Sequence, residues 1–377
     1  MQVPYLLDFL QSLKSARLDD FVDRLHYLSA TALLTFFALL IGSKQTFGEP
    51  LTCMIPSQFP DSWNKYVHQF CYVSGTYQTE SEWNVDAKNQ TIKNSLNYYQ
   101  WVPYVIAVQA FFFYVPHLLW LCLLSLSNVD FKTTIERCVD SQKKSNADRL
   151  AVINDVATAL HSSRSFNPWG KWATLFYIMS KMLNLINVSS QLFVMNKFVG
   201  NNQFNWAWKI VVSMLRDQDW HATGLFPRIS FCDFEKNTLG NLQNHTVQCV
   251  LMINMLNEKA FVIIDVCLFF LLIITMINLI HSTYTILFTH TSIITDLRSY
   301  VKYESLGVTD KQIRSFVENV LHWDGCLLLR FVGDHAGKLT AIQLAGRLLQ
   351  QSRVNELTEV ESRLPEKINA NIIVKPR

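Results

Sequence analysis

Four long apolar segments interrupt an otherwise polar chain. They cover residues 27–43, 101–126, 171–195 and 261–289. A helix needs roughly 20 mostly apolar residues to cross about 30 Å of hydrocarbon. The second and fourth segments reach that length and the first comes close to it. The pattern therefore predicts an all-α polytopic membrane protein with four transmembrane helices packed as a bundle.

The third segment is the least apolar of the four, but its polar residues are ordered. Ser180, Asn184, Asn187 and Gln191 follow one another at steps of four, three and four residues, which places them on one side of a helix. The fourth segment repeats the pattern with Thr275, Asn278, Ser282, Thr285 and Thr289. Such stripes suit hydrogen bonding between helices inside a bundle, and they also suit the lining of a pore.

Composition narrows the function classes. Half of the 377 residues are hydrophobic, only 17% are charged, and the net charge is +3. A nucleic-acid-binding protein needs a surplus of clustered Lys and Arg, which is missing here. We find no nucleotide-binding, hydrolase or metalloprotease motif and no CxxC pair. We therefore expect neither an enzyme nor a catalytic residue, and neither a cofactor nor a metal site.

The distribution of basic residues predicts the orientation in the membrane. Lys and Arg number 3, 6 and 12 in residues 1–26, 127–170 and 290–377, but only 4 and 6 in residues 44–100 and 196–260. The positive-inside rule then places both termini in the cytoplasm. The predicted organisation is a cytoplasmic amphipathic N-terminal helix (1–26), span 1 (27–43), extracellular loop 1 (44–100), span 2 (101–126), a cytoplasmic loop (127–170), span 3 (171–195), extracellular loop 2 (196–260), span 4 (261–289) and a cytoplasmic C-terminal helical region with a tail (290–377).

Cysteines and sequons agree with this topology. Each predicted outer loop contains two cysteines, Cys53 and Cys71 in the first and Cys232 and Cys249 in the second. In an oxidising compartment these four predict two disulfides that staple the outer loops, with three connectivities open. The N-glycosylation candidates Asn89 and Asn244 also lie in the outer loops. The cytoplasmic loop and C-terminal region predict a cap of helices.

Two local features concern the membrane helices. Apolar residues recur at helical spacing near the N-terminus, on a helix that either lies on the bilayer surface or folds back into a central vestibule. These residues are Val3, Leu6, Leu7, Leu10 and Leu13. Pro116 lies near the middle of the second span, where a missing backbone donor predicts a kink.

Several motifs resemble those of innexins, the invertebrate gap-junction proteins. The clearest is Tyr98, Tyr99, Gln100, Trp101 and Val102 (YYQWV) at the start of the second span. The stretches CYVSGTY at 71–77 and HTVQCV at 245–250 are similar to that family as well. The resemblance implies an octameric ring of homomeric or heteromeric subunits around a wide pore, and docking of two such hemichannels.

The resemblance also implies roles for individual residues. The disulfides would join Cys53 to Cys249 and Cys71 to Cys232, and the helix from Val3 to Leu13 would form the pore funnel. The expected protein is a plasma-membrane gap-junction channel for ions and small molecules. It would contact membrane lipids and apposed hemichannels but no nucleic acid. The alternative is an undocked, pannexin-like hemichannel, because a glycan on Asn244 would hold opposed rings apart. A non-conducting adhesion protein remains a third possibility.

Overall fold

The computed structural model describes residues 19–57, 59–80, 92–125, 130–162, 171–199, 206–216, 226–238, 240–305 and 307–354. The chain divides into two compact units, each assembled from segments far apart in sequence. We call them the helical unit (Met1–Arg24, Pro116–Leu183 and Thr275–Arg377) and the sheet unit (Leu25–Val115 and Asn184–Ile274).

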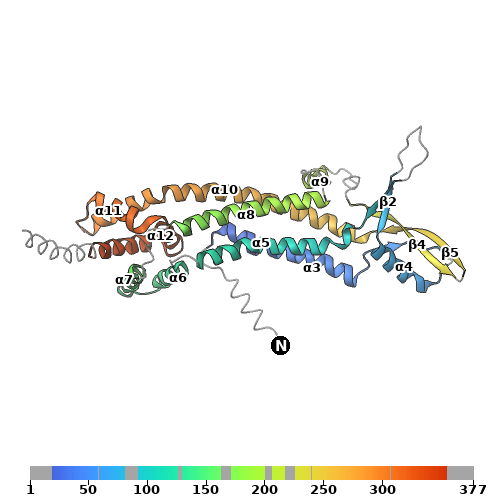
Figure 1. The fold of residues 1–377 in the computed structure, drawn as a ribbon, viewed down its shortest axis with the longest axis horizontal. Coiled ribbons are helices and arrows are strands. Elements are labelled where there is room, and N and C mark those ends of the chain that lie inside the picture. Colours follow the sequence, from blue (N-terminus) through green and yellow to red (C-terminus); the bar gives the residue numbers. More distant parts are fainter. Residues whose placement is uncertain are drawn as a thin grey trace, which may run out of the picture. The chain divides into compact units, whose positions relative to one another are not determined.

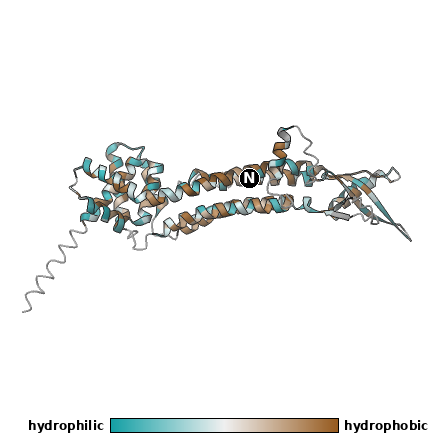
Figure 2. Ribbon diagram, turned by 90° about the horizontal axis from the view of Figure 1, so that it is seen from above, coloured by the Kyte–Doolittle hydropathy of each residue, from teal (hydrophilic) through white to brown (hydrophobic). Residues whose placement is uncertain are grey.

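Long apolar helices contribute residues to both units. The first combines α2 (Phe21–Arg24), η1 (Leu25–Ala30) and α3 (Thr31–Phe47), and the others are α5 (Val102–Ser125), α8 (Trp172–Val199) and α10 (Met252–Tyr303). Three helical stretches in the described part of the chain are long and apolar enough to cross a membrane: Phe21–Phe47, Val102–Leu124 and Met252–Tyr303. Much of their length is hydrophobic, as Figure 2 shows.

The helix α10 is much longer than the predicted fourth span. Its 52 residues correspond to roughly 78 Å at 1.5 Å per residue, more than twice the hydrocarbon thickness. No described residue of α10 is proline or glycine, so nothing in its sequence interrupts the backbone hydrogen bonds. The helix therefore continues well beyond the apolar run at one end or at both.

The sheet unit contains an antiparallel sheet of five strands in the order β1-β5-β4-β2-β3 (Figure 1). The strands are β1 (Thr52–Cys53), β2 (Thr76–Glu80), β3 (Ile92–Leu96), β4 (Ile229–Thr238) and β5 (Asn241–Val250). The helix α4 (Asp61–Ser74), the short 3-10 turn η2 (Tyr98–Gln100) and α9 (Trp206–Leu215) complete the unit. Gly240 connects β4 to β5 with a φ of 88°, a left-handed conformation that favours glycine.

This sheet corrects the prediction of an all-α protein. The described residues are mainly helical, but both predicted outer loops contribute strands. Burial alternates along β4, where Ser230, Cys232 and Phe234 are buried and the residues between them are not. Val247 and Cys249 continue the alternation on β5. These segments therefore have the two-residue period that indicates a half-buried strand.

The helical unit packs several short helices around one apolar core. They are α6 (Phe131–Ser141), α7 (Asn146–Ser162), α11 (Asp310–Phe316), η4 (Val317–Leu321), α12 (His322–Ala336) and a helix over 338–354. Asp130 caps α6 by accepting a hydrogen bond from the backbone N–H of Thr133, and Thr309 and Gln312 form a capping box at α11. Gly337, with a φ of 78°, ends α12 and leads into the next helix.

Candidate functional site

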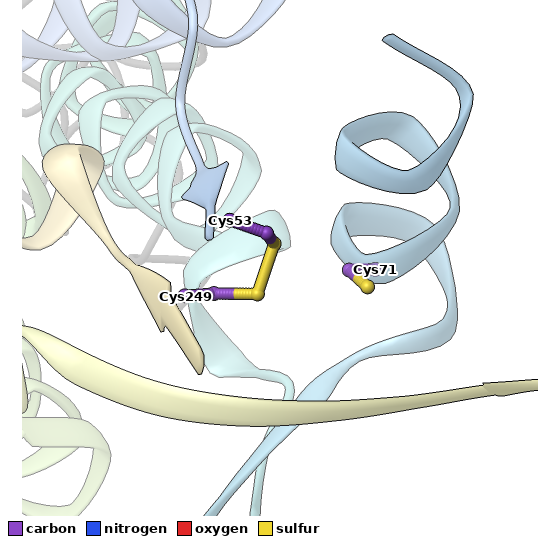
Figure 3. A group of neighbouring side chains, drawn as sticks. All are labelled: Cys53, Cys71 and Cys249. Atoms are coloured by element: carbon purple, nitrogen blue, oxygen red, sulfur yellow. A yellow bond between two sulfur atoms is a disulfide. The ribbon is translucent and has the colours of Figure 1, made fainter. Parts of the chain in front are cut away.

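Two disulfides hold the sheet together. Cys53 of β1 is joined to Cys249 of β5, its register partner, and Cys71 of α4 is joined to Cys232 of β4. These are the pairs that the family resemblance implies. The sulfur atoms of Cys53, Cys71 and Cys249 lie within 4.8 Å of one another (Figure 3). Because all three are bonded to another sulfur, none is a thiolate that could bind a metal.

Aromatic packing fixes α4 against the middle of the β4–β5 hairpin. The ring of Phe59 stacks on Trp63 at 5.7 Å between centroids and meets His245 edge-on at 5.1 Å. The Lys236 ammonium lies 4.7 Å from the centre of the Trp63 ring. A cation over an indole face stabilises partly exposed sites by about 0.5–1 kcal/mol. These contacts give the exposed hairpin a defined position in the sheet unit.

Asp233 organises the exposed face of the sheet. Its carboxylate accepts hydrogen bonds from the Tyr77 hydroxyl at 2.8 Å and the Thr246 hydroxyl at 2.7 Å, so it links β2, β4 and β5. Asn244 is exposed on β5, opposite Glu235 of β4. The other glycosylation candidate, Asn89, lies outside the described residues.

The YYQWV motif anchors this layer to the membrane helices. The Gln100 side chain donates to the backbone carbonyls of Tyr72 and Val73 at the end of α4. The Tyr99 carbonyl accepts a 2.8 Å hydrogen bond from Gln45 of α3, and the Tyr99 ring is fully buried. Burial also raises the pKa of Tyr72 to about 12, so its phenol is neutral at physiological pH. The motif thus joins α3, α4 and α5.

A second anchor connects β4 to the start of α10. Arg228 pairs with the buried carboxylate of Glu258 at 3.2 Å, and Asn254 donates to the Pro227 carbonyl at 2.8 Å. The backbone N–H of Leu251 donates to the Arg228 carbonyl. Together the two anchors attach α3, α5 and α10 to the same sheet, through the ends of these helices that belong to the sheet unit.

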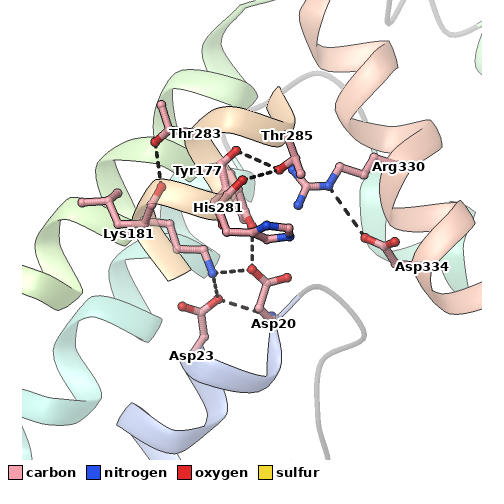
Figure 4. A network of polar contacts seen from close by, with 11 residues as sticks. Asp20, Asp23, Tyr177, Lys181, His281, Thr283, Thr285, Arg330 and Asp334 are labelled. Atoms are coloured by element: carbon pink, nitrogen blue, oxygen red, sulfur yellow. Dashed lines mark hydrogen bonds and ion pairs between the residues drawn. The ribbon is translucent and has the colours of Figure 1, made fainter. Parts of the chain in front are cut away.

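The helical unit contains a buried ion cluster that sequence reasoning missed (Figure 4). The Lys181 ammonium of α8, whose side chain is 3% exposed, lies 2.6 Å from Asp20 and 2.5 Å from Asp23. The Tyr177 hydroxyl donates to Asp20 at 2.7 Å. Burial alone would raise the pKa of Asp20, but the Lys181 charge and these hydrogen bonds hold it below its ordinary value. Asp20 is therefore ionised at neutral pH.

Comparison with known proteins decides the family. The sequence pattern that describes innexins matches residues 19–352. The chain belongs to the innexin family. Innexin-3 of Caenorhabditis elegans is 33% identical over 373 residues, which cover 94% of this chain and 88% of that protein. Innexin unc-9 of the same organism is 31% identical over 369 residues, covering 92% of this chain and 96% of that protein. The predicted resemblance is thereby confirmed.

As an innexin, the protein belongs to a family of channel proteins rather than enzymes. Family membership and the apolar helices make it a multi-pass plasma-membrane protein of gap junctions. The funnel residues Val3, Leu6, Leu7, Leu10 and Leu13 lie outside the described residues. Pro116 is buried inside α5, and its kink stays a prediction.

The polar stripes of this innexin make contacts within and between helices. Asn187 of α8 donates to the Phe112 carbonyl of α5 at 3.2 Å, and Gln191 donates to Asn187 at 3.3 Å. On α10, the hydroxyls of Thr285 and Thr289 donate to carbonyls of their own helix. The Asn187 contact joins two helices, as the first of the two explanations expects. The Thr285 and Thr289 contacts lie within α10 and do not distinguish bundle packing from a pore lining.

Proposed function

We propose that the protein is a gap-junction channel subunit that forms oligomeric hemichannels, which dock between cells and pass ions and small molecules. The observation that carries this conclusion is the innexin match over residues 19–352, which includes both the apolar helices and the disulfide-stapled layer. Transport is passive. A pore wide enough for metabolites leaves ions hydrated, so selectivity is weak and depends mainly on wall charge.

Four spans follow if α8 crosses the membrane as well. Its polar residues lower its mean hydropathy, but Asn187 and Lys181 have partners on other segments. Its exposed apolar residues instead recur at spacings of three, four and seven, which makes one continuous stripe. They are Leu175, Met179, Met182, Ile186 and Phe193. Such a stripe suits lipid, while the polar stripe is satisfied by protein.

In this proposal the four spans and the positive-inside rule together assign a side of the membrane to each remaining segment. Residues 1–26, 127–170 and 290–377 lie in the cytoplasm, and residues 44–100 and 196–260 lie outside the cell. Spans occupy 27–43, 101–126, 171–195 and 261–289. The disulfides support this assignment, because stable disulfides belong to the oxidising side of the membrane.

The sheet layer is the docking surface in this proposal. The exposed β4–β5 hairpin belongs to the second predicted outer loop, and both outer loops must meet the opposed hemichannel. Subunits assemble into an octameric ring with innexin chains of the same or another kind, and residues 3–13 form the pore funnel. The undocked hemichannel remains the alternative function, motivated by the exposed Asn244.

Sidedness can be tested with two single cysteines placed on either side of α8. Lys144→Cys and Glu235→Cys replace exposed residues that precede and follow this helix. On intact cells, a membrane-impermeant maleimide should label Glu235→Cys but not Lys144→Cys, and permeabilisation should expose both. Equal labelling of the two variants on intact cells would show that α8 does not cross the membrane.

Function can be tested in pairs of cells that both express the protein. Dye transfer and a junctional current between the two cells are expected, and neither should appear when only one cell expresses it and the other has no innexin. Surface expression in both cells without coupling would contradict the proposal. Uptake of dye from the medium under those conditions would instead indicate the undocked hemichannel.

A further inference from the structure

A ligand-sized cavity lies inside the helical unit, between α10, α12 and the helix over 338–354. Its volume is about 340 Å³, within the range of small-molecule sites. Most of the wall is apolar and includes Phe288 and Leu297 of α10, Leu329 of α12, and Ala341 and Ile342 of the last helix. A cavity with such walls suits a hydrocarbon chain better than a polar metabolite.

One edge of the cavity is charged, and one of its charges is incompletely paired. Arg330 of α12 has a side chain that is 20% exposed, and its Nε lies 3.8 Å from Asp334. Its Nη1 is buried and has no hydrogen-bond partner within the described residues. Figure 4 shows the guanidinium pointing from α12 towards Thr285 of α10, and both residues line the cavity. The Arg330–Asp334 pair is longer than a hydrogen bond, so an acceptor at the accessible edge of the guanidinium would stabilise the site.

The other charged residues of the cavity wall indicate which chemical group would accept a hydrogen bond from Arg330. Besides Arg330 and Asp334, the wall contains Lys338 and Asp296, so two cations face two carboxylates. A bare carboxylate or an anionic head group would satisfy the cations but would repel Asp296. A head group that combines a phosphate with an ammonium matches both signs.

The position of the cavity along α10 also suits a lipid head group. The apolar run of α10 ends near Phe288, and the cavity begins at Tyr284 and continues to Leu297. It therefore extends from the last turn of the apolar run into the first polar turns. Tyr284 and Phe288 are 59% and 52% exposed. Head groups of the nearer leaflet lie at this level if α10 crosses the bilayer through its apolar run.

We propose that this cavity binds a zwitterionic phospholipid of the cytoplasmic leaflet, with its phosphate on the accessible edge of the Arg330 guanidinium and one acyl chain along Phe288 and Leu297. The proposal rests on the proposed function for its sidedness, because that function places this end of α10 at the inner face. The volume is near the lower limit for ligand sites, so one chain enters and the other stays in the bilayer. The ammonium of the head group faces Asp296.

The test uses photoreactive lipids in membranes of cells that express the full-length channel. One arm supplies phosphatidylcholine with a photoreactive group at the end of one acyl chain, and the other arm supplies a photoreactive free fatty acid. After irradiation and purification, mass spectrometry locates the modified residues. The phosphatidylcholine probe should label peptides that contain residues 284–297 and 329–345, and the fatty acid should label them far less.

Three variants assign this labelling to the cavity. Arg330→Gln should lower it about tenfold, the effect of one charge-assisted hydrogen bond. Arg298→Gln is the matched control, since Arg298 pairs with Asp310 and does not line this cavity, and it should label as the unchanged protein does. Ala341→Phe fills the cavity while leaving Arg330 in place, and it should also lower labelling. All three should reach the cell surface.

Equal labelling of the unchanged protein, Arg330→Gln and Ala341→Phe would overturn the proposal, as would equal labelling by the fatty acid. A density map of the assembled channel in which a neighbouring subunit's side chains fill the cavity would also overturn it. Failure of the proposed function is a separate result, because it appears as absent coupling between paired cells whatever the labelling shows. Coupling with no labelling would reject the lipid site alone.

Discussion

Most cysteines of the sheet unit are cross-linked, whereas the described cysteines of the helical unit are free thiols. In the sheet unit, Cys53, Cys71, Cys232 and Cys249 form two disulfides. In the helical unit, Cys138 and Cys326 are free thiols buried in the apolar core. Both units have a continuous apolar core, and in the sheet unit the four bonded cysteines are part of it. The disulfides add covalent links between segments that are far apart in sequence, which the described cysteines of the helical unit do not form.

The difference teaches that compartment and packing together decide what a cysteine does. The same residue type is a cross-link where the surroundings are oxidising and an ordinary apolar side chain where they are reducing. Each unit also has charged or polar anchors that hold distant segments together. In the sheet unit they are the YYQWV motif and the Arg228–Glu258 pair, and in the helical unit the anchor is the Lys181 cluster.

The largest effect on coupling should come from breaking a disulfide. Cys71→Ser should destabilise the sheet unit by about 2–5 kcal/mol and remove coupling between paired cells, because α4 loses its link to β4. Surface biotinylation and junctional current measure the two effects. Cys267→Ser is the control, since Cys267 is an exposed free thiol, and it should couple normally. Normal coupling by Cys71→Ser would show that the layer holds together without this disulfide.

The next effect should come from the ion cluster. Lys181→Met leaves two buried carboxylates without their cation, which costs about 3–5 kcal/mol. Thermal melting of the detergent-purified protein should show the loss. Lys143→Met removes a lysine whose side chain is 77% exposed in its pair with Asp140, and it should cost about 0–1 kcal/mol.

A triple variant checks the cause of that loss. Adding Asp20→Asn and Asp23→Asn to Lys181→Met removes the uncompensated charges, so part of the stability should return. If the triple variant melts no higher than Lys181→Met, the loss comes from packing of the lysine stem rather than from charge.

A smaller effect is expected at the anchor of the sheet unit. Gln100→Ala removes the donor to the Tyr72 and Val73 carbonyls and should cost about 1–3 kcal/mol. Trp101→Phe changes a neighbour that is 63% exposed and should stay within about 0.5 kcal/mol of the unchanged protein. Similar melting temperatures for both variants would mean that the motif has no anchoring role.

The buried thiols offer a chemical comparison. Burial raises the pKa of Cys138 to about 11 and that of Cys326 to about 12. At neutral pH almost none of either thiol is the reactive thiolate, and neither is accessible. A permeant maleimide should therefore leave both unmodified in the folded protein and modify both after denaturation, as peptide mass spectrometry would show. Rapid labelling of the native protein would show that this core opens readily.

The smallest effect is expected at Asn244. A variant at this position tests whether the hemichannels dock. Asn244→Gln replaces an exposed strand residue and should change stability by no more than about 0.5 kcal/mol. Coupling and electrophoretic mobility should both stay as in the unchanged protein. Faster migration of the variant together with a gain of coupling would favour the glycosylated, undocked hemichannel.

Hydropathy and periodicity predicted the positions of the long helices closely but did not predict the sheet. The predicted second span, 101–126, nearly coincides with α5 at Val102–Ser125, because a long uninterrupted apolar run has few alternatives. Within the predicted cytoplasmic loop, 127–170, the structure has two helices, α6 and α7, with a break between them. The strands were missed because a short alternating pattern is a much weaker signal than a membrane-length apolar run.

The sites differ in how much of each could be predicted from the sequence. Spacing left three disulfide connectivities open, and only the family resemblance selected the pairs present in the structure. The Lys181 cluster could not be inferred, because Asp20 and Asp23 lie about 160 residues away in sequence and only tertiary packing brings them to α8. The signal that could have found it is an isolated lysine within an apolar segment, which requires a partner.

The strand order of the sheet constrains how the protein is made. β5 lies between β1 and β4, and the disulfide from Cys53 closes a loop of 196 residues. During synthesis β1 stays without its strand partner until residues up to Val250 have been made, whereas β2 and β3 of the same segment can pair with each other. In the proposed topology those residues reach the lumen only after the intervening helices have been inserted. A subunit that fails this insertion can complete neither the sheet nor the disulfide from Cys53 to Cys249.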